Sequence, residues 1–397
     1  PQLAGAVPAN SQFERLFDEI CSLVEEQFYR PDLVKTVFLR NKPAFRAKLA
    51  EISNLDEFSA LVNLMLGELK TSHTAFLGRD SQEYFQYLSV FGKLPQIARR
   101  FHGRPILYPS IGINVRVIDG KTFVFWVLDG SPAHRAGIKK GDEVLSADGR
   151  AFHPVRSLTN RVGRPVTLVI RRSVLAKPQS IRVTPQSVNP HQEYLDAQLA
   201  SVRVFKLFGK KIGYIHIWSY AGSDYHEAFQ DELTSGRLKD ADALIWDLRD
   251  GLGGASPDYL NIFNQRVPVI WFKDRNGKGD AYDPQWRKPV VMLTNGRSKS
   301  GKEVLAAGFR KYKLGTIVGE RTGGAVVAGR ILTLSDQSLL YLAVTGGTVD
   351  GQNLEGVGIA PDIEVPMPIP YLGGRDLQLV KALEFVCGRP VGIQVLE

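Results

Sequence analysis

Ser300 is well placed for nucleophilic chemistry, because it lies where a predicted buried strand, PVVMLTN, passes through a short loop into a predicted helix. The first turn of a helix presents unpaired N–H groups and a positive dipole, which suit a developing oxyanion. The simpler interpretation is that Ser300, or Ser298, only caps this helix, with Glu303 completing a capping box. This segment alone leaves both interpretations open.

A glycine-rich loop supplies a second feature of an acyl-transfer site. The predicted buried strand ALIWDLRD is followed by Gly251-Leu252-Gly253-Gly254. Glycines let a backbone approach a ligand closely while its amides stay available. A simple turn between a strand and a helix would use glycines too. In combination with Ser300, the loop predicts two backbone donors that face one nucleophile, which is the arrangement of an oxyanion hole.

A serine hydroxyl is a poor nucleophile at neutral pH and needs a general base. Of the seven histidines, His216 falls within a predicted strand and His226 within a predicted helix, where a structural role is the default. His73 lies between two hydroxyl residues just past a helix end, in the kind of irregular segment whose side chains serve sites. Lys299 and Lys302 flank the nucleophile, but residues one or two positions away on a helix point in other directions. We therefore expect His73 to be the base.

The elements around these residues predict a helical N-terminal region followed by β and α/β parts. Apolar residues recur at helical spacing between residues 11 and 69. The stretch 82–103 shows no clear period, and we interpret it as a linker with a partial strand. From residue 211 onwards, buried-strand patterns alternate with amphipathic helices, as in IGYIHIWSY followed by DYHEAFQDELTSG. This alternation favours an α/β core with a partly parallel sheet.

Between these regions, short β-like segments surround the sequence DGSPAHRAGIKKGDEVLSADGR. Over residues 107–185 the chain resembles a PDZ domain of the type found in bacterial proteases. The resemblance implies that the loop Ser110-Ile111-Gly112-Ile113 presents backbone N–H groups to the C-terminal carboxylate of a peptide. The peptide would then add a strand to the edge of the sheet. The alternative is that Gly112 serves only as a turn.

Five sequence blocks stand in the order typical of the carboxyl-terminal processing, or tail-specific, peptidases: IGYIHIWSY, DLRDGLGG, TNGRSKSGKE, GTIVGERTGG and GVGIAPDIEV. The chain resembles this family over essentially its whole length. The resemblance implies a helical region with the TSH motif over 1–103, a PDZ-like β domain over 104–186, and a peptidase core with a C-terminal helix over 187–397. The implied fold class is α/β (α+β), with a spiral β/α core of the type shared with ClpP and crotonase.

Carried over residue by residue, this resemblance implies that Ser300 is the nucleophile. It also implies that the amides of Gly253 and Gly301 are the donors of the oxyanion hole. The usual enzymes of the family pair their serine with a lysine in an F-G-K-G segment, and the lysine position reads Ala325 in this sequence. The usual base is therefore missing.

The tricorn core protease, another branch of the same family, accounts for this difference. Its GELGTSH motif is similar to residues 67–73, GELKTSH, and GERTGGA is also closer to that branch. The resemblance implies a Ser-His-Ser-Glu tetrad of Ser300, His73, Ser72 and Glu355. In this mechanism His73 removes the Ser300 proton, while Ser72 and Glu355 orient the imidazole and stabilise its charged form. The chemistry needs no cofactor and no metal.

The composition is that of a globular chain of 397 residues, with 44% hydrophobic and 23% charged residues. The formal charge of +9 is scattered along the sequence, and the fingerprints of nucleic-acid binding are absent, so no nucleic-acid partner is expected. No apolar run approaches the ~20 residues of a membrane-spanning helix. Cys21 and Cys387 have no metal-ligand spacing, and their pairing stays open.

Taken together, these patterns predict a serine endopeptidase of the carboxyl-terminal processing type, whose partners are protein or peptide substrates recognised through their C-termini. The alternative is a catalytically inactive protein that binds peptides or apolar ligands on the same fold, since the usual lysine is absent. The chain starts at Pro1, which fits a removed signal peptide or a trimmed chain. A periplasmic or secreted location is expected, with the cytoplasm as the alternative, and homo-oligomer formation stays open.

Overall fold

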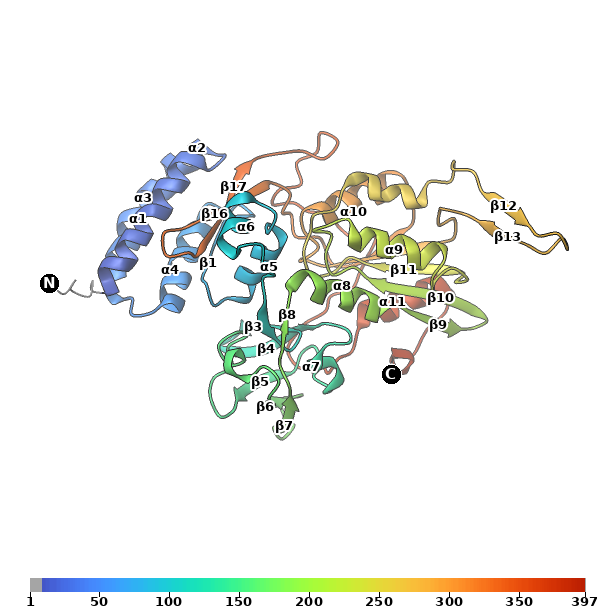
Figure 1. Cartoon of the computed structure of the whole chain (residues 1–397), viewed down its shortest axis with the longest axis horizontal. Coiled ribbons are helices and arrows are strands. Elements are labelled where there is room, and N and C mark those ends of the chain that lie inside the picture. The colour runs from blue at the N-terminus through green and yellow to red at the C-terminus, as the bar shows by residue number, and fades with distance from the viewer. Residues whose placement is uncertain (1–8, 397) are drawn as a thin grey trace. The chain divides into compact units, whose positions relative to one another are not determined.

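The computed structural model describes residues 9–396 (Figure 1). Its contacts divide the chain into two compact units. Among the described residues, the first unit contains 9–104 together with 324–357, and the second contains 105–323 together with 358–396. The first unit is therefore discontinuous in sequence, because a segment from the later part of the chain completes it.

The first unit combines helices with a small antiparallel sheet. Its helical segments are α1 (Ala9–Gln27), α2 (Pro31–Leu33), the π-helical η1 (Val34–Phe38), α3 (Leu39–Ala47), the 3-10 helix η2 (Lys48–Glu51), α4 (Leu55–Gly67), α5 (Gln82–Val90) and α6 (Pro95–Phe101). The strands β1 (Ala75–Leu77), β16 (Ala328–Thr333) and β17 (Leu339–Thr345) pair in the order β1-β17-β16. The predicted helical N-terminal region is confirmed.

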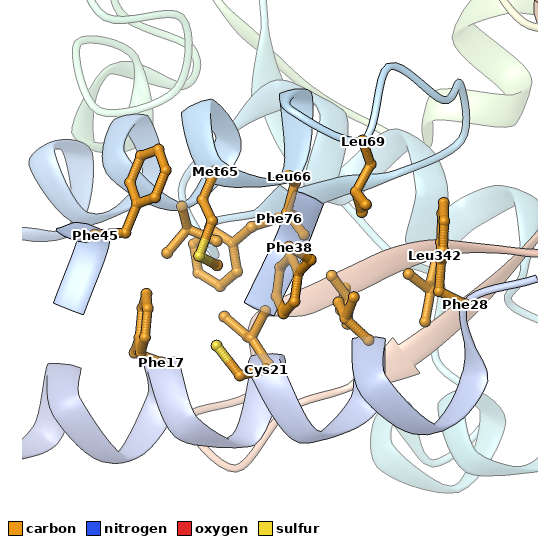
Figure 2. Packing of buried hydrophobic residues seen from close by; sticks show 14 of the residues in the cluster. Phe17, Cys21, Phe28, Phe38, Phe45, Met65, Leu66, Leu69, Phe76 and Leu342 are labelled. Carbon is orange, nitrogen blue, oxygen red and sulfur yellow. The ribbon is translucent and has the colours of Figure 1, made fainter. Parts of the chain in front are cut away.

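The apolar faces of α1 and α4 meet in the core of this unit (Figure 2). Phe17 and Cys21 from α1 pack with Met65 and Leu66 from α4 and with Leu342 from β17, and all five are buried. Burial raises the pKa of the Cys21 thiol to about 12, so it stays protonated and behaves as a small apolar side chain. Because Leu342 belongs to the same core, the late segment 324–357 is part of the N-terminal unit.

The interpretation of residues 82–103 as a linker with a partial strand was wrong, because α5 and α6 occupy this stretch. Ser81 caps α5, where its hydroxyl accepts a hydrogen bond from the Tyr84 N–H at 3.2 Å. Pro95 occupies the first turn of α6, a position that proline favours. Helices of about two turns are too short to display a readable period.

The part of the second unit that was predicted to resemble a PDZ domain is an antiparallel β structure. A five-stranded sheet contains β3 (Ile113–Ile118), β4 (Lys121–Val127), β5 (Glu143–Ala147), β6 (Val166–Arg171) and β7 (Gln179–Val183), in that order. The strands β2 (Tyr108–Ser110) and β8 (Gln186–Val188) pair separately, and the helices are α7 (Pro132–Arg135) and the 3-10 helix η3 (Thr159–Arg161). The predicted strands and the short Pro-led helix are confirmed.

The core of the second unit is a six-stranded sheet in the order β18-β15-β14-β11-β10-β9. Its strands are β9 (Arg203–Leu207), β10 (Lys210–His216), β11 (Ala243–Asp247), β14 (Val290–Thr294), β15 (Thr316–Gly319) and β18 (Ile363–Glu364). All neighbours run parallel except β9, which pairs antiparallel with β10. The predicted partly parallel sheet is confirmed, and every residue of β11 and β14 is buried, as expected for strands covered on both faces.

The elements that complete this unit are α8 (Pro190–Ser201), α9 (Asp224–Thr234), the 3-10 helix η4 (Pro257–Phe263), the hairpin β12 (Ile270–Lys273) and β13 (Gly279–Tyr282), α10 (Gly301–Lys311), α11 (Leu377–Cys387) and the 3-10 helix η5 (Ile393–Leu396). Figure 1 shows the hairpin extending away from the six-stranded sheet. Among the helices that the structure describes, none has the length and apolar character to cross a membrane.

Helices α10 and α11 are held on the sheet by apolar side chains. Leu383 of α11 is buried in one cluster with Ile245 and Val291 of the sheet. On strand β11, the next residue after Ile245 is Trp246, which therefore points to the opposite face. Its ring centroid lies 6.2 Å from that of Phe309 in α10. Since only residues 295–300 separate β14 from α10, the first turn of α10 lies near the carboxyl ends of the parallel strands, where α/β sheets build their sites.

Candidate active site

Ser300 stands between β14 and α10 in a backbone conformation that only glycine adopts readily, with φ of 57° and ψ of −127°. Such conformations cost about 1–3 kcal/mol and cluster at functional sites. Neighbouring groups hold the strain in place. The Ser300 N–H donates to the Glu303 carboxylate at 3.2 Å, and the Thr322 hydroxyl donates to the same carboxylate at 2.6 Å. The predicted capping box of Ser300 and Glu303 is present, but a residue that served only as a helix cap would not need this backbone geometry.

Ser298, the second candidate for the cap of α10, has a separate structural role. It is completely buried. Its hydroxyl donates to the carbonyl of Leu248 at 2.9 Å and accepts a hydrogen bond from the N–H of Asn295 at 3.1 Å. Ser298 therefore ties the loop after β14 to the end of β11.

The predicted glycine loop lies directly against the nucleophile. A Cβ atom at Gly253 would be 2.8 Å from the Ser300 Cβ, and one at Gly301 would be 2.3 Å from the backbone nitrogen of Ala255. Neither position has room for a side chain. The structure thus brings Ser300, Gly253 and Gly301 together, at the distance of closest backbone approach.

The residue that opens this loop, Asp250, is anchored on both its backbone and its side chain. Its N–H donates to the Asn295 side-chain oxygen at 3.2 Å, and its carboxylate accepts from the Asn295 amide at 3.0 Å. Lys140, from the PDZ part, lies 3.4 Å from the other carboxylate oxygen. Sequence reasoning missed this anchoring, because it joins residues from three distant segments and follows no fixed spacing.

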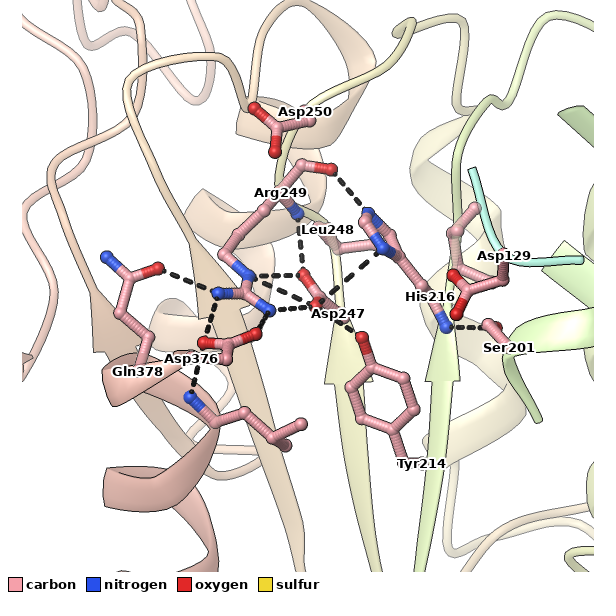
Figure 3. Close-up of polar contacts among 12 residues, drawn as sticks. Asp129, Ser201, Tyr214, His216, Asp247, Leu248, Arg249, Asp250, Asp376 and Gln378 are labelled. Carbon is pink, nitrogen blue, oxygen red and sulfur yellow. Dashed lines mark hydrogen bonds and ion pairs between the residues drawn. The ribbon is translucent and has the colours of Figure 1, made fainter. Parts of the chain in front are cut away.

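A buried network of charges supports the end of β11, just before the glycine loop (Figure 3). The Arg249 guanidinium donates to Asp247 at 2.5 Å and to Asp376, in the turn before α11, at 2.7 Å. The Tyr214 hydroxyl also donates to Asp247 at 2.8 Å. Burial opposes the ionisation of Asp247, but the Arg249 guanidinium outweighs burial and holds the pKa of Asp247 well below its usual range.

His216 belongs to this network and not to the nucleophile. Its Nε2 donates to the Arg249 carbonyl at 2.8 Å, because a carbonyl oxygen can only accept. Burial lowers the pKa of His216, and its ring stacks on Trp218 at a centroid distance of 3.8 Å. These contacts agree with the structural role expected for a histidine in a strand.

The predicted histidine, serine and glutamate of the tetrad form one hydrogen-bonded cluster in the first unit. The Ser72 hydroxyl oxygen lies 2.8 Å from His73 Nδ1 and donates to the Glu355 carboxylate at 3.0 Å. Glu355 also accepts from the backbone N–H groups of Ser72, at 2.7 Å, and Val326, at 2.9 Å. Glu355 is thus fixed by contacts from two segments that lie far apart in sequence.

This arrangement determines the tautomer of His73. Because Ser72 gives its single proton to Glu355, its oxygen must accept from His73, so the ring proton resides on Nδ1. In the neutral imidazole, Nε2 is then the nitrogen with the lone pair, as a general base requires. Like Ser300, His73 has a left-handed backbone, with φ of 54°.

The predicted peptide-binding loop is compact and internally bonded. Its glycine, Gly112, has φ of 78°, and a Cβ there would lie 2.2 Å from the Ser131 Cβ. The Gly112 N–H donates to the Ser110 hydroxyl oxygen at 2.9 Å, and that hydroxyl donates to Glu193 of α8 at 2.5 Å. Ile111 and Ile113 are buried. A peptide carboxylate would therefore compete with Ser110 for the Gly112 amide.

Comparison with known proteins agrees with this architecture. Residues 211–365 match the sequence model of peptidase family S41, and residues 109–183 match that of the PDZ domain. The chain is 26% identical to the putative tricorn protease homolog 2 of Streptomyces coelicolor, over 92% of this chain and 31% of that protein. It is 25% identical to the carboxy-terminal processing protease CtpB of Bacillus subtilis, over 97% of this chain and 75% of that protein.

Among solved structures, the tricorn protease matches 98% of this chain and 37% of its own, with a TM-score of 0.56 and 19% sequence identity. Mature CPAF matches 96% of this chain and 98% of its own, with a TM-score of 0.53 and 13% identity. These likenesses show the fold. The chain spans about a third of the length of the tricorn relatives that it matches. The matched segments show that residues 109–183 carry the sequence pattern of a PDZ domain and residues 211–365 that of peptidase family S41.

Proposed function

We propose that the chain is a serine endopeptidase of the carboxyl-terminal processing type, with a catalytic tetrad of Ser300, His73, Ser72 and Glu355. The observation that carries the proposal is the hydrogen-bonded cluster of Ser72, His73 and Glu355. It leaves His73 Nε2 unprotonated, while the strained turn at Ser300 presents a hydroxyl beside backbone amides. Acyl transfer requires these two parts, a general base and a nucleophilic hydroxyl.

In the proposed reaction, His73 Nε2 takes the Ser300 hydroxyl proton as the oxygen attacks the scissile carbonyl carbon. The amides of Gly253 and Gly301 stabilise the resulting oxyanion. The imidazolium then gives its proton to the leaving amine, and the acyl group stays on Ser300. A water molecule, activated by His73, hydrolyses this ester and restores the enzyme. Glu355, acting through Ser72, stabilises the positive charge that His73 carries during both steps.

Two buried side chains support a histidine base over a lysine base. Ala325, which occupies the position of the usual lysine, has 1% of its surface exposed and carries no titratable group. Lys302 donates to the carbonyls of Ile217 and Asp250, each at 2.7 Å. Its ammonium is thus committed to backbone acceptors, whereas a base needs a lone pair directed at the nucleophile.

For substrate recognition we propose protein or peptide chains that dock their C-termini on the PDZ domain, through the loop of residues 110–113. The three-part organisation into 1–103, 104–186 and 187–397 stays a prediction, to which the contacts add that 324–357 belongs with the N-terminal unit. The periplasmic or secreted location and homo-oligomer formation also remain predictions.

The test uses active-site labelling by a fluorophosphonate probe and hydrolysis of casein as a loosely folded substrate. We expect Ser300→Ala to abolish both. The base is tested with His73→Asn, because asparagine tolerates the left-handed backbone of this position while removing the imidazole. The matched control is His102→Asn, an exposed histidine with φ of 50°.

We expect His73→Asn to lose labelling and hydrolysis, and His102→Asn to retain both. Hydrolysis that persisted in His73→Asn would exclude His73 as the base. Folded wild-type protein that neither labels nor cleaves would instead favour a non-catalytic binding protein on the same fold.

A further inference from the structure

Lys302 has an unusual setting for a lysine. It is the second residue of α10, two positions after the nucleophile, and its side chain is completely buried. Lysines are almost never fully buried unless they are paired. Here the partners are two main-chain oxygens, since Nζ donates to the carbonyls of Ile217 and Asp250. Burial lowers the pKa of Lys302 to about 7, while the nearby Asp250 and Asp247 favour its charged form and Arg297 opposes it.

One acceptor carbonyl lies at the start of the glycine loop, and the other lies beside a residue that bonds to the loop. Asp250 opens the loop and has φ of 54°, a conformation that a non-glycine residue holds only when its surroundings impose it. Ile217 directly precedes Trp218, whose carbonyl accepts the Leu252 N–H of the loop at 2.8 Å. A single ammonium therefore connects the segments that follow the carboxyl ends of the adjacent parallel strands β10 and β11.

The position of the glycine loop relative to α10 can vary only slightly if its amides are to serve the nucleophile. The Gly253 backbone lies so close to Ser300 that a Cβ on Gly253 would be 2.8 Å from the Ser300 Cβ. Oxyanion donors act only when they lie about 2.7–3.1 Å from the developing charge. An apolar side chain of the same length would fill this space without the desolvation cost of an ammonium. The charged group adds two directed bonds that hold the backbone of the loop.

We propose that Lys302 is a positioning residue of the oxyanion hole. It ties the first turn of α10, with Ser300 and Gly301, to the loop that carries Gly253. This inference rests on the proposed function, because it gives Gly253 and Gly301 their role as oxyanion donors. It goes beyond that function by assigning a task to a lysine that the tetrad does not use.

The experiment replaces Lys302 by methionine, which keeps the length and removes the donors. We expect kcat for a peptide amide to fall by about tenfold to a hundredfold with KM within about twofold, because an oxyanion hole acts in the transition state. The matched control is Lys311→Met, an exposed lysine at the end of the same helix, which should leave both constants unchanged. Lys302→Gln keeps one neutral donor group, so its kcat should lie between that of Lys302→Met and that of the wild type.

A second measurement follows hydrogen exchange of the amides in 250–254, which needs no catalysis. We expect exchange in this segment to accelerate by about tenfold in Lys302→Met, and to stay unchanged elsewhere in the protein. If Lys302→Met does not fold, the comparison is made with Lys302→Gln, whose folding is checked by its thermal melt.

The outcomes separate this inference from the proposed function. If hydrogen exchange of the amides in 250–254 is unchanged in Lys302→Met, Lys302 does not hold the loop in place. This result would overturn the inference even if the wild type proved inactive. A loss that appears in KM, with kcat preserved, overturns the positioning role. A loss as complete as in Ser300→Ala, combined with activity in His73→Asn, would make Lys302 the base and overturn both proposals.

Discussion

Replacement of Ser72 by alanine tests the link between the imidazole and the carboxylate. The hydroxyl makes two bonds, with His73 Nδ1 at 2.8 Å and with Glu355 at 3.0 Å. A hydrogen bond between neutral groups contributes about 1 kcal/mol, and one to a charged group about 1.5–3 kcal/mol. Both bonds matter most when the imidazole is charged, so we expect the barrier to rise by about 2–4 kcal/mol. This corresponds to a loss of about 30-fold to 1000-fold in kcat.

The same change should have little effect on the folded state. Glu355 keeps its bonds to the backbone N–H groups of Ser72, at 2.7 Å, and Val326, at 2.9 Å. The carboxylate therefore stays in place without the hydroxyl. The assay compares kcat and KM for a peptide amide with the melting temperature, and Ser72→Thr, which keeps a hydroxyl, serves as the control. A Ser72→Ala enzyme with wild-type kcat would refute the role of the hydroxyl.

Three further predictions concern the loop and the buried charges. Gly253→Ala places a methyl group 2.8 Å from the Ser300 Cβ, so kcat should fall by about a hundredfold or more while circular dichroism shows an intact fold; wild-type turnover would contradict the contact. Burial raises the pKa of Glu193 from 4.5 to about 7, so the melting temperature should fall as the pH rises through this range. Glu193→Gln should remove that dependence, and a persistent slope would assign it to another group. Asp376→Ala leaves the buried Arg249 without one partner and should lower the free energy of unfolding by about 3 kcal/mol, as measured in urea; a loss below about 1 kcal/mol would show that Asp247 suffices.

Elements with strong local signals could be predicted from the sequence. The continuous apolar runs of β11 and β14 indicated buried strands, which the structure confirms. The glycines at 251–254 indicated a loop without room for side chains, and a Cβ on Gly253 would indeed lie 2.8 Å from the Ser300 Cβ. The short helices α5 and α6 were missed because two turns carry almost no periodic signal. Local patterns are readable when one element is long enough to repeat them.

Other features depend on contacts between distant segments, and no local pattern reports them. Ser72 and Glu355 are bonded across 283 positions, and only the family motifs predicted that they meet. The strained φ of Ser300 results from the packing of two loops and not from its own preference. Lys302 was judged only by its direction on the helix, because nothing in the sequence shows which carbonyls a buried lysine will reach.

Because the first unit is discontinuous in sequence, its parts are synthesised at different times. Ribosomes build a chain from its N-terminus, so His73 is made well before Glu355 and the strand β17 of the same unit. Until residue 355 has been added, the growing polypeptide lacks the carboxylate that bonds to Ser72, the hydrogen-bond partner of this histidine. The proposed tetrad can therefore assemble only after this late segment has been synthesised.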